Sequence, residues 1–113
     1  MNKPIEFLPL GASAERELVA GLCRGEAGCY RQLYDRFAPR VQRLLLRIFA
    51  DPQLARDAVQ STFLIVFEKI DRFDCRSSLL TWITRIAINE AHGQRRKSAR
   101  RPPERHDDGP LPP

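Results

Sequence analysis

Hydrophobic side chains recur every three or four positions along most of this chain, the spacing that places them on one face of an α-helix. Alternation at every second position, which would indicate strands, is missing, and glycine and proline mostly fall between the periodic segments. The pattern predicts an all-α fold, a compact bundle of about four helices over residues 14–101. Residues 1–13 are expected to form an N-terminal segment.

The first helix is expected from about Ala14 to Arg24, with Ser13 as a possible N-cap. Its apolar residues at helical spacing are Leu18, Val19 and Leu22. The second segment carries a longer buried stripe, interrupted by Pro39, which removes one helical hydrogen bond and predicts a kink or a short break near Phe37–Ala38. The stripe consists of Tyr30, Leu33, Tyr34, Phe37, Val41, Leu44, Leu45 and Ile48.

The third helix is expected from about Pro52 to Ile70, with Asp51 as its N-cap. Its stripe consists of Ala55, Ala58, Val59, Thr62, Phe63, Val66, Phe67 and Ile70. After the loop "DRFDCRSS", Ser77 or Ser78 caps a fourth helix that Gly93 should weaken. That helix buries Leu79, Trp82, Ile83, Ile86 and Ala87. The Pro-rich polar tail, residues 102–113, predicts a disordered linker.

The third helix has a second face that the core does not explain. Polar residues frame an aliphatic one at helical spacing, which favours a protein-binding surface. The alternative is a wider core, covered by the N-terminal segment "PIEFLPL". The face consists of Asp57, Gln60, Ser61, Leu64 and Glu68, and Ile65 falls on or beside it.

The fourth helix carries a polar ridge opposite its core face: Thr81, Arg85, Asn89, His92 and Arg96. Arginine binds phosphate or guanine bidentately, and asparagine offers a donor and an acceptor to a base edge. The net charge of +5 is concentrated here, since residues 85–105 hold seven basic and two acidic residues. Such a patch attracts a polyanion, most often a nucleic acid, although a solvated basic tail is the alternative.

The loop before this helix adds Arg76, Ser77 and Ser78, close to a helix N-terminus that favours anions. Trp82 is more typical of a core residue than of a stacking platform, but it can present a ring edge to a base. Loop, ridge and basic run, which includes Arg95, together predict a surface that grips an unpaired strand.

Other classes of function find little support in the sequence. It has no Gly-rich phosphate loop and no nucleophile with an obvious base, so we do not expect an enzyme or a cofactor. A metal site from Cys23, Cys29, His92 and His106 is conceivable but lacks ligand spacing, and small buried hydrophobes are the expected role of the cysteines. Without a membrane span or signal peptide, the chain is expected in the cytoplasm.

Two stretches carry a family resemblance: "YRQLYDRFAPRVQRLLLRIFADPQLARDAVQSTFLIVFEKIDRF" and "SSLLTWITRIAINEA". They strongly resemble region 2 of extracytoplasmic-function (ECF) sigma factors, bacterial initiation subunits of RNA polymerase. The resemblance covers about Leu18 to Arg101, and "DAVQSTFL" and "TWITRIAIN" in this order are its most specific parts. It implies transcription initiation by a binding module without a cofactor.

The resemblance also implies separate roles for the two faces. Asp57, Gln60, Ser61 and Leu64 would contact the coiled coil of the polymerase β′ subunit. The loop and fourth helix would open and read the promoter −10 element on the non-template strand. Asn89, Arg76, Ser77 and Ser78 would line a pocket for an extruded base, while Arg85, Arg95 and Arg96 would hold phosphates. An anti-sigma protein would be a further partner that covers these surfaces.

Some positions depart from the family pattern. Ser61 stands where a glutamate is usual, and Cys75 and Arg76 stand where glycine and an acidic residue are frequent. The family also has a second helical domain, region 4, which is absent from residues 102–113, so the chain is expected to be a first domain alone or a natural short form. A helical protein-interaction module that does not bind DNA is the alternative function.

Overall fold

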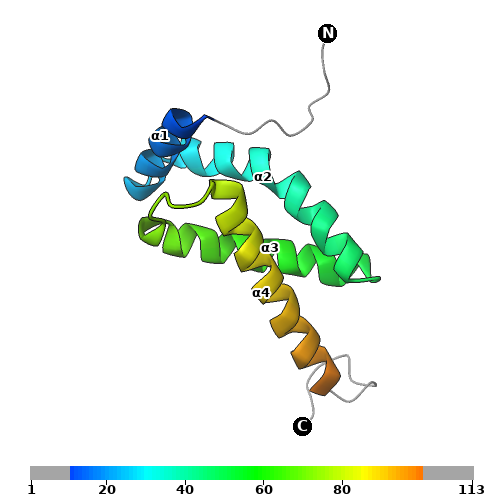
Figure 1. The fold of residues 1–113 in the computed structure, drawn as a ribbon. Coiled ribbons are helices and arrows are strands. Elements are labelled where there is room, and N and C mark those ends of the chain that lie inside the picture. Colours follow the sequence, from blue (N-terminus) through cyan, green and yellow to red (C-terminus); the bar gives the residue numbers. More distant parts are fainter. Residues whose placement is uncertain (1–10, 101–113) are drawn as a thin grey trace.

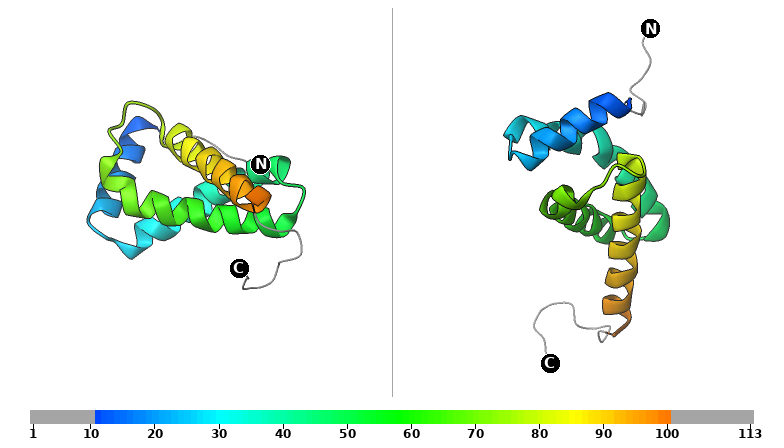
Figure 2. Two further views of the ribbon diagram at one scale, coloured as in Figure 1. Left: turned by 90° about the horizontal axis from the view of Figure 1, so that it is seen from below. Right: turned by 60° about the vertical axis from the view of Figure 1, so that its left-hand side comes forward.

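The computed structural model describes residues 11–100, which form a bundle of α-helices (Figure 1). α3 packs against both α2 and α4, and α4 crosses α3 with its C-terminal end projecting from the bundle (Figure 2). The all-α prediction is confirmed, whereas the predicted disordered tail, residues 102–113, lies outside the described residues. The elements are α1 (Ala12–Cys23), α2 (Ala27–Ile48), α3 (Pro52–Lys69), the 3-10 turn η1 (Ile70–Arg72) and α4 (Leu79–Arg100).

The helix termini show where local sequence determines the ends. Asp51 caps α3 as predicted, because its carboxylate accepts from the Gln53 amide at 2.9 Å. Ser78 caps α4, since its Oγ accepts from the Thr81 amide at 3.1 Å. The prediction of Ser13 as the cap of α1 was wrong: the helix begins at Ala12, with extended Gly11 before it. α4 also continues through Gly93 to Arg100.

Pro39 lies inside α2, which remains one helix from Ala27 to Ile48. A short break at Phe37–Ala38 is therefore not observed, but the ribbon bends along its length in Figure 1. The proline loses a single hydrogen bond, and the buried Phe37, Ala38 and Val41 hold the flanking turns against the rest of the bundle.

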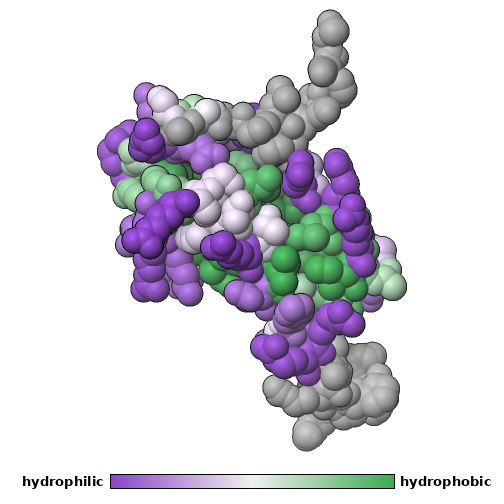
Figure 3. Space-filling model, in the orientation of Figure 1, coloured by the Kyte–Doolittle hydropathy of each residue, from purple (hydrophilic) through white to green (hydrophobic). Residues whose placement is uncertain are grey.

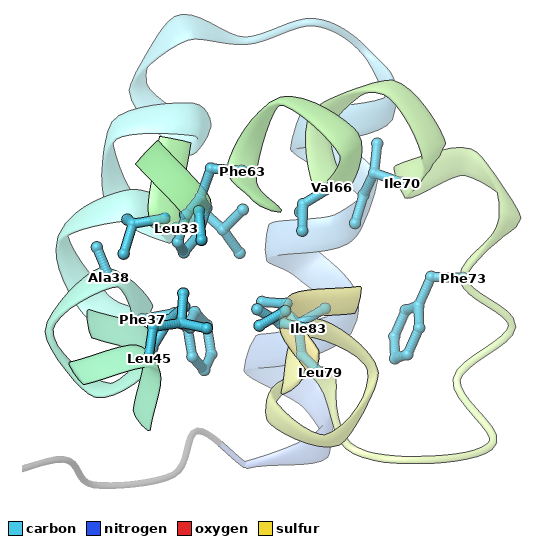
Figure 4. Close-up of a cluster of buried hydrophobic side chains, with 14 of the residues drawn as sticks. Leu33, Phe37, Ala38, Leu45, Phe63, Val66, Ile70, Phe73, Leu79 and Ile83 are labelled. Carbon is cyan, nitrogen blue, oxygen red and sulfur yellow. The ribbon is translucent and has the colours of Figure 1, made fainter. Parts of the chain in front are cut away.

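The core takes side chains from every helix, and the stripes predicted from the sequence supply most of it (Figure 4). Tyr34 is an exception, because its side chain is 42% exposed although it was predicted to be buried. Its ring covers the edge of the core and packs edge-to-face on Phe63, with ring centroids 5.0 Å apart. Among the described residues, Thr62 is the buried polar one, and its hydroxyl donates to the Ala58 carbonyl at 2.7 Å.

The corner between α1 and α2 depends on a glycine. A Cβ at Gly21 would overlap Cys29 Sγ, so we expect Gly21→Ala to lower the free energy of unfolding by about 1–3 kcal/mol. Gly28 is the matched control, because a Cβ there meets open space and alanine should stabilise α2 by about 0.5–1 kcal/mol. Urea unfolding followed by circular dichroism measures both. Equal effects of the two substitutions would contradict the steric explanation.

Candidate nucleic-acid interface

The outer face of α4 is open to solvent along its whole described length. The ridge predicted from the sequence is exposed at every position: Thr81, Arg85, Asn89, His92 and Arg96. Arg95 and Lys97 are exposed beside its C-terminal end, which concentrates positive charge there. A cationic ridge of this kind holds phosphates along a strand and offers polar groups to its bases.

The loop before α4 is held in place by local hydrogen bonds. Asp74 accepts from the Arg76 amide at 3.1 Å and pairs with the Arg76 guanidinium at 3.5 Å. Ser77 is half-buried, and the Ser78 hydroxyl accepts the hydrogen bond that caps α4. The Arg76 side chain itself is 87% exposed, so it can still turn towards a ligand.

The N-terminus of α4 already holds an anion of the protein itself. Glu15 of α1 accepts a hydrogen bond from the Leu79 amide at 3.1 Å, and the Ser78 hydroxyl accepts one from the Thr81 amide. The sequence predicted a site for a ligand anion here, but these backbone donors are satisfied internally. The carboxylate instead ties α1 to the start of α4 and complements its dipole.

A pocket of about 260 Å³ opens beside the ridge, between the end of α3, η1 and α4. Its apolar walls include Trp82, which is half-buried and packs on Phe73 with ring centroids 5.2 Å apart. Asn89 also lines this pocket, together with two cationic residues and one acidic residue. The lining residues are Ile65, Lys69, Arg72, Trp82, Ile86, Asn89 and Glu90.

The structure brings Asn89 together with Trp82 but not with the loop serines. Ser78 precedes Asn89 by eleven positions, which is about 16 Å along the helix axis. The pocket lining accordingly contains neither Arg76, Ser77 nor Ser78. Asn89 and the loop therefore lie towards different ends of α4, and the predicted grouping of the loop residues with Asn89 around one base stays a prediction.

Lys69, Arg72 and Ile65 were not among the site residues predicted from the sequence. They lie near the end of α3 and in η1, and only the tertiary fold brings them to Asn89. The sequence signal for Lys69 and Arg72 was weak, because it consisted only of two cations three positions apart before the loop that leads to α4. Ile65 had been assigned to the α3 face around Leu64, whereas its side chain lines the pocket.

The second predicted surface lies on α3. Asp57 and Gln60 are exposed, Leu64 is 69% exposed, and Ser61 is half-buried. Asp57 accepts a hydrogen bond from the Gln53 side chain at 3.0 Å, which orients it along the helix. An aliphatic side chain this exposed adds little to the stability of the isolated domain, and it is available to a partner.

A backbone feature marks the loop between η1 and α4. Cys75 has φ of 64°, a left-handed conformation that costs a residue with a Cβ about 1–2 kcal/mol. Cys75→Gly removes this conformational cost, but glycine also gives the unfolded chain more conformational freedom, which offsets part of the gain in stability. The substitution should therefore raise the free energy of unfolding by about 0.5–1 kcal/mol. Cys75→Val should lower it. Thermal unfolding compares the two, and a glycine variant no more stable than the parent would contradict the prediction.

The remaining sequence hypotheses concern metals and membranes. Within residues 11–100, no cluster of three histidine, cysteine or acidic residues is arranged to hold a metal ion. His106 of the four-residue metal hypothesis lies outside that range. No helix of the same residues has the length and hydropathy that crossing a bilayer requires.

Comparison with known proteins finds sigma factors of bacterial RNA polymerase among the relatives of this chain. The RNA polymerase sigma-H factor of Pseudomonas aeruginosa is 30% identical over 90 residues, covering 80% of this chain and 47% of the relative. The ECF RNA polymerase sigma-E factor of Haemophilus influenzae is 30% identical over 89 residues, covering 79% and 47% respectively. The chain thus spans about half the length of the curated relatives that it matches.

A solved structure has the same fold. It is an engineered region 2 of sigmaE in complex with GTAAAA, determined by NMR, and it superposes with a TM-score of 0.70 at 24% identity. The match covers 88% of this chain and 96% of that one. The Sigma-70 region 2 family model matches residues 33–101, which include α3, the loop, the pocket and the whole of α4. The resemblance to region 2 of ECF sigma factors is confirmed, and the chain belongs to the Sigma-70 region 2 family.

Proposed function

We propose that this domain acts in transcription initiation as a binding module rather than as an enzyme. It docks on the polymerase core through α3 and binds the non-template strand of the promoter −10 element through α4. One observation carries the proposal: Asn89 lines a pocket at the edge of an exposed cationic ridge. The fold is that of a region 2 solved with GTAAAA, which supports single-stranded DNA as the ligand.

The pocket is suited to one extruded base. Its volume of about 260 Å³ is below the ~300–1,000 Å³ range of drug-sized ligand pockets, which favours a single small planar group. Trp82, Ile65 and Ile86 supply apolar walls, and the Asn89 amide can donate to and accept from a base edge. Stacking and hydrogen bonding here must offset an unstacking cost of a few kcal/mol.

The cations around the pocket hold the backbone of the same strand. Lys69 and Arg72 line the pocket from α3 and η1, and Arg85 and Arg96 extend the positive surface along α4. Phosphate contacts of this kind position the strand without specifying its sequence. Base choice therefore rests on the Asn89 pocket, and affinity rests largely on the arginines.

The α3 face is the proposed contact for the coiled coil of the polymerase β′ subunit. Leu64 supplies an exposed apolar anchor, and Asp57 and Gln60 supply polar groups beside it. An apolar anchor with a polar surround is the usual form of a protein-binding hot spot. An anti-sigma protein would compete by covering the same face.

Oligonucleotide binding separates the two roles assigned to α4. Asn89→Ala should cost about 1–3 kcal/mol with the preferred base at one position and little with other bases there. Arg96→Ala should weaken binding to all sequences alike and reduce the salt slope for single strands by about 0.7. Fluorescence anisotropy with single-stranded GTAAAA, its complement and single-base variants measures both effects.

Arg43→Ala is the matched control, because Arg43 is an exposed arginine on α2, away from the ridge. The loss for Arg96→Ala should exceed that for Arg43→Ala. If all three variants bind every oligonucleotide as the parent does, α4 is not the DNA surface. The alternative of a protein-interaction module without DNA binding would then be favoured.

A further inference from the structure

A second exposed surface of the domain lies between α2 and α4, on the side of α4 away from the Asn89 pocket. Figure 3 shows hydrophobic residues gathered there, with hydrophilic side chains along the outer edge. Leu80, Thr84 and Ile88 form one row along α4, at steps of four positions, and all are half-buried. Leu44 of α2, a helix that contacts α4, is also half-buried and packs against the core.

Arginines border this α2–α4 face. Arg43 and Arg47, one and three positions from Leu44 on α2, are exposed, and Arg95 is exposed on α4 beyond Ile88. The face thus combines a partly uncovered aliphatic row with a positively charged edge. The DNA surface includes Arg95 at one end of this face, but neither the DNA role of the ridge nor the docking role of α3 uses the row of Leu80, Thr84 and Ile88.

The start of the described chain lies next to this face. Glu15, in the first turn of α1, accepts a hydrogen bond from the Leu79 amide, the residue before Leu80. Figures 1 and 2 both place the N-terminal end of α1 beside the beginning of α4. The Gly11 carbonyl accepts from the Glu15 amide at 3.0 Å, so the described chain begins one helical turn from the residue that caps α4, at the end of the row that starts with Leu80.

We propose that residues 4–10, "PIEFLPL", bind back onto the α2–α4 face. The segment contains Ile5, Phe7, Leu8 and Leu10 and carries one acidic residue, Glu6, whose charge is opposite in sign to that of the basic edge. Seven residues span at most about 23 Å when extended, and the row from Leu80 to Ile88 is about 12 Å long. The tether is thus long enough to cover the whole row.

Tethering makes even a weak contact effective. A segment joined by a short linker experiences an effective concentration on the order of millimolar at its site. A docked segment would shield Leu80 and Ile88 from water and from other proteins while leaving Arg85, Asn89 and His92 exposed. The inference goes beyond the proposed function and does not depend on DNA or polymerase binding.

Nuclear magnetic resonance of the complete chain tests the proposal. We expect nuclear Overhauser effects between the Phe7 ring and the methyl groups of Leu80 or Ile88. The full-length Phe7→Ser/Leu8→Ser variant should shift those methyl signals and leave that of Leu64, on the α3 face, unchanged. Absence of these effects, together with unchanged Leu80 and Ile88 signals in the variant, would overturn the proposal.

A mixture of isotope-labelled and unlabelled chains identifies the occupant. If the segment binds within its own chain, an isotope-filtered experiment shows no intermolecular nuclear Overhauser effects. The intramolecular ones then persist on dilution. Intermolecular effects between Phe7 and Ile88 that fade on dilution would mean that the face binds the segment of a second copy, and the intramolecular proposal would be wrong.

Discussion

Replacing Ile83 by alanine should lower the free energy of unfolding by about 2–5 kcal/mol. Ile83 has no exposed surface and lies on α4 within the central cluster of Figure 4. Its removal loses transfer free energy and leaves a cavity that the surrounding helices cannot fill completely. In a domain of this size each kcal/mol corresponds to roughly 4–8 °C in Tm. Thermal unfolding followed by circular dichroism should therefore show a fall in Tm of about 8–40 °C, or an unfolded variant.

Ile88→Ala is the matched control, since it removes the same atoms from the same helix. Ile88 is half-buried among the described residues, so its loss should cost less than about 1 kcal/mol with the α2–α4 face uncovered, and more with residues 4–10 bound there as proposed. If the two substitutions proved equally destabilising, Ile88 would have to be as fully buried as Ile83. Comparing them thus also measures how well the α2–α4 face is covered in solution.

Helical periodicity was enough to predict the core because each helix presents one face to the same interior. Ala58, Val66 and Ile83 were assigned to that interior from spacing alone, and all three have no exposed surface. The caps at Asp51 and Ser78 were predictable for a similar reason, since capping depends on residues within one turn.

Errors arose where tertiary contacts outweighed local rules. Tyr34 has helical spacing appropriate to the core, but it lies at the edge of the α2–α3 contact, where only one side of its ring is covered. Glu15 reads locally as an ordinary first-turn acid, yet it caps a helix 64 positions further along the chain. No local pattern reveals a partner at that separation.

The candidate site was predictable in part for the same physical reason. The α4 ridge follows from spacing within a single helix, and its residues are exposed as predicted. The pocket beside Asn89 also needs Lys69 and Arg72, which precede the loop and reach Asn89 only when α3 and α4 pack. The role of Ser77 and Ser78 in a base pocket stays a prediction, because the pocket that Asn89 lines lies eleven positions along α4 from Ser78 and does not include them.

Leu64→Asp should weaken binding to the polymerase β′ coiled coil by at least about tenfold, which corresponds to a loss of about 1.4 kcal/mol or more. The leucine is 69% exposed, so its replacement should leave the stability of the domain almost unchanged. An aspartate there would carry a new charge into the interface, beside Asp57 and Glu68 on the same helix. Gln60→Ala should weaken binding by a smaller factor, because it removes polar contacts without adding a charge.

Leu46→Asp is the matched control, because Leu46 is also an exposed leucine, 44% accessible, but lies on α2 towards the C-terminal end. Titration calorimetry with a purified coiled-coil fragment should give parental affinity for Leu46→Asp and a loss for Leu64→Asp, with equal Tm values. An equal loss for both would indicate a general effect of added negative charge on the attraction between the partners. Parental affinity for Leu64→Asp would remove α3 as the docking face, and the exposed leucine would then need another partner.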